Sequence, residues 1–125
     1  MRVFISIAAI LAWLFGAALL FVPADFYKPT GIAMTPMIAT LAQAHGATLA
    51  GLGLVNWLAR DADRKGIIAI LAGNLLVQVL SLYVVLLTMS LGAGTAVAPG
   101  VIIHVVLGSL FAFFLVRTIR SRPVR

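Results

Sequence analysis

Four long apolar runs, separated by short stretches rich in polar residues, proline or glycine, make up most of this 125-residue chain. They cover residues 3–22, 38–59, 67–90 and 98–116. At about 1.5 Å of rise per residue, each run can cross a hydrocarbon core about 30 Å thick. The pattern predicts an all-α fold, a four-transmembrane-helix bundle with up-down-up-down topology. Residues 1–125 are expected to form a single integral membrane domain, and the loop 23–37 is the place where a short re-entrant or surface helix is expected.

The composition agrees with this class of protein. The chain is 63% hydrophobic and 10% charged, whereas a soluble domain is about 25% charged. It contains no cysteine, which excludes a disulfide framework, a thiolate nucleophile and a thiolate metal site. Most of the surface is therefore expected to face lipid.

Most of the positive charge lies at those ends of the apolar runs that would share one side of the membrane. Arg2 precedes the first run, three basic residues lie in the loop 60–66, and four arginines lie in the tail 117–125, while Lys28 lies at the opposite end. The positive-inside rule then predicts that both termini and the 60–66 loop are cytoplasmic. The basic tail is interpreted as a topology signal in contact with anionic lipid, in preference to a nucleic-acid site.

Small residues recur at helical spacing and predict where helices pack closely, because they let helix backbones approach in lipid. In the third run, polar residues at +4, +7 and +14 share one helix face, starting at Asn74. We expect this polar stripe to form interhelical hydrogen bonds, and a polar pathway through the bundle is the alternative. The residues predicted to pack helices together are Ala8, Ala12, Gly16, Gly46, Gly53, Asn74, Gly100 and Gly108.

Two histidines lie inside the apolar runs. His45 is fifteen residues before Arg60, and His104 is thirteen before Arg117, so their depths differ by about 3 Å. Gln78 falls at the same level on a helix of opposite direction. Ionisable residues at such depth usually face the bundle interior or water.

This layer has two interpretations. The first is hydrogen bonding that joins helices. The alternative is a haem, pigment or quinone site, since Gly100 and Gly108 lie one turn either side of His104 and leave room for a flat macrocycle. By helical angle His45 shares a face with Gly53, so the two imidazoles could point toward each other. A metal site is not expected, because no carboxylate or thiolate joins the two histidines.

The acidic residues argue against catalysis and proton coupling. Asp25, Asp61 and Asp63 all lie in the stretches between the apolar runs. Without an embedded carboxylate, a nucleophile–base set or a phosphate loop, the chain is not expected to be an enzyme.

Several segments carry a resemblance: Trp13-Leu14-Phe15-Gly16, then Pro23, then Gly51 to Arg60, and Gly73-Asn74. Together they resemble small bacterial four-helix membrane proteins of the DoxX-like grouping. The resemblance implies a four-helix bundle in a bacterial inner membrane and implies no activity.

The sequence therefore predicts a small non-catalytic integral membrane protein. The favoured function is an accessory or assembly subunit that packs against a larger membrane complex, with the lipid bilayer, other membrane subunits or a second copy as partners and no nucleic acid. One alternative is a bundle that binds haem, a pigment or quinone at the His45/His104 layer. The other is a small transporter or channel.

Overall fold

The computed structural model describes residues 1–93 and 97–121. Within these residues the chain is helical and has no strand. Four helices are long and apolar enough to cross a membrane, which confirms the predicted all-α fold. They are α1 (Arg2–Phe21), α3 (Pro36–Ala59), α4 (Arg64–Thr88) and α5 (Ala98–Arg120). The fold is that of a multi-pass membrane protein.

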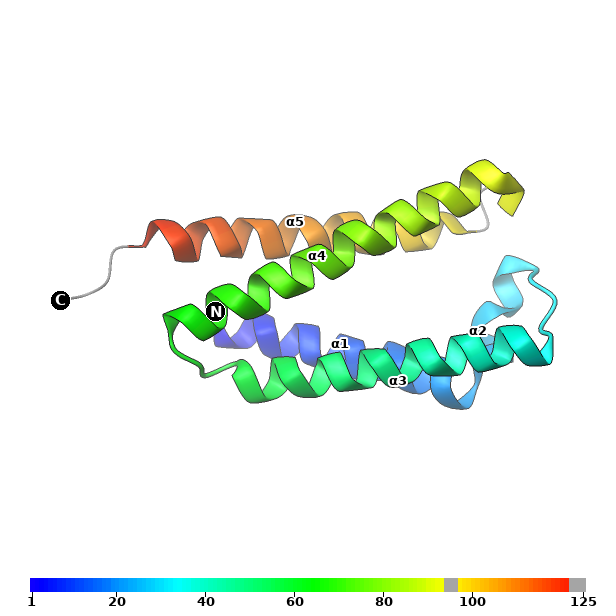
Figure 1. Ribbon diagram of the computed structural model, residues 1–125, viewed down its shortest axis with the longest axis horizontal. Helices are drawn as coiled ribbons and strands as arrows, with labels where there is room; N and C mark the ends of the chain where they lie inside the picture. Colours follow the sequence, from blue (N-terminus) through cyan, green and yellow to red (C-terminus); the bar gives the residue numbers. More distant parts are fainter. Residues whose placement is uncertain (94–96, 122–125) are drawn as a thin grey trace. The chain divides into compact units, whose positions relative to one another are not determined.

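The helices form two compact units, residues 1–61 and residues 62–125. In the first unit α1 packs along α3, and in the second α4 packs along α5 (Figure 1). Each unit is an antiparallel pair of long helices, called here the first and the second hairpin. Each hairpin is described by itself below.

A short helical connection joins the two helices of the first hairpin. Val22 leaves the helical conformation with φ −135° and ψ 50°, and Pro23 then opens α2 (Pro23–Tyr27). The single 3-10 turn η1 (Lys28–Thr30) follows and ends at Gly31, whose φ of 71° is left-handed. Helical structure is thus present in the loop where a short helix was expected. Asp25, predicted in a loop, lies in the first turn of α2.

Side-chain caps set the starts of α3 and α4. The Thr35 hydroxyl accepts a hydrogen bond from the Ile38 amide at 3.3 Å. The Asp63 carboxylate accepts one from the Gly66 amide at 2.8 Å and places negative charge at a helix N-terminus, where it is favourable. The predicted starts at 38 and 67 were therefore too late. In α4 the error arose because the charged residues 64 and 65, assigned to a loop, form the capped first turn.

The ends of α4 and α5 also differ from the prediction. The regular part of α4 ends at Thr88 and continues as a π-helical turn, η2 (Met89–Ala93). The last helix was predicted to end at 116, but α5 runs to Arg120, because arginine favours helix and complements the dipole in a last turn. Residues 117–120 of the predicted tail are thus helical. The predicted loop residues 94–96 and tail residues 122–125 lie outside the described residues.

Candidate functional site

A polar contact within the second hairpin joins Gln78 on α4 to His104 on α5. The Gln78 Oε1 lies 2.8 Å from the His104 Nδ1. With the amide oxygen as the acceptor, the imidazole donates this hydrogen bond from Nδ1. The Gln78 side chain is buried, with 8% of the residue exposed. The structure thus brings together two of the three residues predicted to share one depth, in a bond that links the two helices.

Two other residues of the polar stripe, Asn74 and Thr88, donate hydrogen bonds to carbonyls of α4 itself. The buried Asn74 donates from Nδ2 to the Ile70 carbonyl at 2.9 Å. The Thr88 hydroxyl donates to the Val84 carbonyl at 2.8 Å. Bonds of this kind satisfy polar side chains along a helix without a ligand.

The two glycines beside His104 do not leave a hollow for a macrocycle. A Cβ added to Gly108 would lie 3.4 Å from the Gln78 Cβ, and one added to Gly100 would lie 3.5 Å from a Val85 methyl group. These are ordinary van der Waals distances, so side chains of α4 already fill the space beside both glycines. The residues around His104 therefore do not fit a flat macrocycle stacked on these glycines.

His45 lies outside the packed face of α3. It is exposed, whereas Gly53 is buried. The expectation that the two share one face is wrong, because eight helical residues separate them by about 80° and α1 covers only a narrow stripe of α3. The buried residues of this stripe are Ala42, Gly46, Gly53 and Asn56. His45 belongs to the first hairpin and His104 to the second, and a shared His45/His104 layer stays a prediction.

Glycine sets the closest approach within the first hairpin. A Cβ added to Gly46 would lie 2.7 Å from the Gly16 carbonyl oxygen and 2.8 Å from the Leu20 nitrogen. A Cβ added to Gly16 would lie 2.9 Å from the Gly46 oxygen. Real Cβ atoms do not come so close to backbone, so α1 and α3 touch backbone to backbone here. Nearby on α1, Ala8 is buried and Ala12 is half-buried.

An aromatic and cationic cluster, which the sequence did not reveal, lies next to this contact. The Trp13 Nε1 donates to the Ala50 carbonyl at 3.2 Å, and its ring covers Gly53, where an added Cβ would lie 2.6 Å from Cδ1. The rings of Trp13 and Trp57 are 5.5 Å apart, and the Arg60 guanidinium carbon lies 4.0 Å from the Trp57 ring centroid. The spacing of Trp57 and Arg60, three residues apart on one helix, is the signal that could have indicated this stack.

Charged side chains close the end of the first hairpin. The Asp61 carboxylate lies 3.1 Å from the Arg2 guanidinium and 3.6 Å from that of Arg60. Both Arg2 and Asp61 are largely exposed, so this ion pair contributes little to stability. It aligns the start of α1 with the end of α3.

No protein-family model, no curated protein and no solved structure matches this chain. The resemblance to DoxX-like proteins therefore stays a prediction.

Proposed function

We propose that the protein is a non-enzymatic accessory subunit, and that it packs against another membrane protein through the outer face of α3. This outer face is defined by Ala44, Ala47, Thr48 and Gly51, which lie on the side of α3 that α1 does not cover. All four residues are exposed. Their exposure on a membrane-spanning helix is the observation that carries the proposal.

The chemistry of the outer face is that of a helix-packing surface. A Cβ added to Gly51 would have nothing within 4 Å, and the Thr48 hydroxyl is bonded to the Ala44 carbonyl of its own helix at 3.0 Å. Lipid chains gain nothing from small residues, whereas a second helix can approach closely over them. The outer face is thus a small-residue surface of the kind that α1 and α3 use at Gly16 and Gly46, but α1 does not cover it.

His45 adds a polar group at the edge of the outer face. By helical angle it lies about 60° from Thr48. It is exposed, and it lies near the middle of a 24-residue helix. An ionisable side chain is unfavourable against lipid and usually meets protein or water. A partner that supplies a hydrogen-bonding group to His45 would remove this penalty and give the contact specificity.

The proposed location is a bacterial inner membrane, with both termini cytoplasmic. The charge distribution supports this orientation: Arg60, Arg64 and Lys65 lie at one set of helix ends, and Lys28 lies in the connection at the opposite end. Such a subunit would present its polar tail and the 60–63 connection to the cytoplasm.

Site-specific photo-crosslinking in native membranes tests the proposal. The chain contains no cysteine, so Ala47→Cys gives one attachment point for a photoreactive maleimide on the outer face. We expect a crosslinked product heavier than the chain, whose second component mass spectrometry identifies as a different membrane protein. The proposal would be contradicted if the crosslink formed within the same chain, if it joined two copies of the chain, or if only lipid adducts were found.

Val105→Cys on α5 is the matched control. Val105 lies twelve residues before Arg117 and Ala47 lies thirteen before Arg60, so the two positions have a similar depth along their helices. The exposed side chain of Val105 is larger than those of the small residues on the outer face. We expect several-fold less crosslinking from this position. Equal protein crosslinking from both positions would show that proximity in a crowded membrane, and not the outer face, produces the adduct.

The cofactor alternative has less support in the structure. The space beside Gly100 and Gly108 is filled by Val85 and Gln78.

A further inference from the structure

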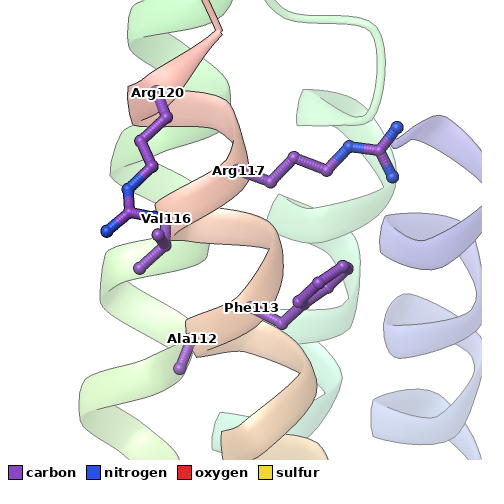
Figure 2. Close-up of a pocket in the computed structure, with 5 residues that line it drawn as sticks. All are labelled: Ala112, Phe113, Val116, Arg117 and Arg120. Atoms are coloured by element: carbon purple, nitrogen blue, oxygen red, sulfur yellow. The ribbon is translucent and has the colours of Figure 1, made fainter.

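One side of α5 near its end carries a shallow hollow with an apolar floor and a basic rim. Its lining residues are Ala112, Phe113, Val116, Arg117 and Arg120. Their spacing of 0, 1, 4, 5 and 8 confines all five to an arc of about 140° around the helix. Figure 2 shows the side chains of Arg117 and Arg120 extending in opposite directions from this arc, with Phe113 below Arg117 and Val116 beside the guanidinium of Arg120. The small Ala112 leaves the floor open.

The two kinds of side chain are separated along the helix axis. From Ala112 to Arg120 the helix rises about 12 Å, with the apolar residues toward the middle of the span and the arginines in its last turn. Phe113 and Val116 are exposed, at 57% and 45%. A ligand that fits must therefore be apolar at the end that lies toward the middle of the span. It must be anionic at the end that lies beside the last turn of α5.

The surroundings of the rim within the second hairpin are cationic. Arg64 of α4 donates to the carbonyls of Thr118, Ile119 and Ser121 at 3.2, 2.8 and 3.3 Å. These bonds hold Arg64, and Lys65 beside it in sequence, at the same end of the hairpin as the rim. The single acid among residues 62–125 is Asp63, and its carboxylate caps α4.

We propose that this hollow binds an anionic phospholipid from the bilayer. Arg117 and Arg120, whose side chains extend apart in Figure 2, would turn toward each other to hold the headgroup phosphate, because guanidinium groups match phosphate oxygens in charge and geometry. One acyl chain would lie along Phe113 and Val116 and over Ala112. A soluble phosphate would use the rim but not the apolar floor. Basic pockets on membrane-spanning helices recognise anionic lipids in this way.

Native mass spectrometry of the full chain in neutral detergent tests the proposal, with phosphatidylglycerol and phosphatidylcholine as probes. We expect preferential binding of phosphatidylglycerol. The double variant Arg117→Gln/Arg120→Gln should weaken its binding by about 30-fold, as expected for the loss of two surface cations near an anionic lipid. Retention of the wild-type affinity would overturn the proposal.

Three further arms separate a built site from general charge attraction. Lys65→Gln and Lys28→Gln each remove one cation that does not line the hollow and should change the affinity much less than the double variant does. Ala112→Leu fills the floor without altering charge and should weaken binding several-fold, with the helical circular dichroism signal unchanged as evidence of folding. The proposal fails if Lys65→Gln weakens binding as much as the double variant, if Ala112→Leu has no effect, or if millimolar inorganic phosphate displaces the lipid.

Discussion

The two hairpins of this protein join their helices by different means. In the first, α1 and α3 meet through glycine, and the Gly16 and Gly46 backbones leave no space for a Cβ. In the second, α4 and α5 meet through side chains, with the Gln78–His104 bond in the span and the Arg64 bonds at its end. The small residues are spaced alike in the sequence of both hairpins. They bring two helix backbones into contact in the first hairpin, whereas in the second they face side chains.

The membrane environment explains why helices can associate in either of these two ways. Between membrane helices there is no hydrophobic driving force, so association depends on close van der Waals packing and on interhelical hydrogen bonds. The first hairpin combines backbone contact at glycine with the bonds from Trp13 to the Ala50 carbonyl and from Gln43 to the Leu20 carbonyl. The second hairpin has side chains between its helices, and its interhelical bonds include that between Gln78 and His104. The following predictions test this contrast.

The largest effect is expected at Gly46. Gly46→Ala must move the backbone of α1 or α3 apart, because its Cβ would meet the Gly16 oxygen and the Leu20 nitrogen. We expect the free energy of unfolding to fall by about 1–3 kcal/mol, as for other overpacked contacts. Both tryptophans of the chain, Trp13 and Trp57, lie in the first hairpin, so tryptophan fluorescence during unfolding in mixed micelles measures this hairpin.

Gly51→Ala is the control for Gly46→Ala, since nothing lies within 4 Å of the added Cβ. It should leave stability unchanged or raise it slightly through helix propensity. Equal losses at Gly46 and Gly51 would show that backbone contact does not hold the first hairpin together.

The second effect concerns the bond between Gln78 and His104. A double-mutant cycle with Gln78→Leu and His104→Leu should give a coupling energy of about 0.6 kcal/mol and no more than about 1.7 kcal/mol, the range for hydrogen bonds between membrane helices. The measurement is reversible unfolding followed by circular dichroism. A coupling energy indistinguishable from zero would show that the Gln78–His104 bond does not help to hold the second hairpin together.

A smaller effect is expected at the end of α5. Arg64→Gln removes the charge-assisted bonds to the last carbonyls of α5, so its final turn should fray. Because Arg64 is exposed, we expect a loss of about 0.3–1 kcal/mol confined to this turn. Hydrogen exchange of the amides in residues 117–121 should accelerate by up to about five-fold.

Lys65→Gln provides the comparison for Arg64→Gln, because Lys65 is the adjacent cation in the same helical turn. Its exchange rates should match the wild type. Faster exchange in both variants would assign the effect to net charge and not to the carbonyl contacts of Arg64.

The smallest effect is expected for Gly108→Ala. The added Cβ would lie 3.4 Å from the Gln78 Cβ, an ordinary contact, so stability should change by less than about 0.5 kcal/mol. Gly16→Ala, measured in parallel, should be clearly destabilising. A loss at Gly108 as large as that at Gly16 would mean that both hairpins depend on glycine packing.

Much of this architecture could be predicted from sequence, and the errors have physical causes. The depth of Gln78 relative to His104 followed from counting residues to the basic helix ends, because helical rise is constant. The start of α4 was predicted too late because the charged residues 64 and 65 were assigned to a loop. In the structure they form the first turn of the helix, which Asp63 caps. The exposure of His45 was missed because the width of the buried stripe on α3 depends on how closely α1 approaches.

The sequence by itself determined that this chain has four membrane-crossing helices, because hydrophobic length is a local property of each segment. It also indicated the end at which positive charge collects. Only the tertiary structure decided which glycines admit no side chain, which polar groups on neighbouring helices meet, and which residues of α3 lie outside its contact with α1. Those properties depend on distances between residues far apart in the chain, and these distances are fixed by packing.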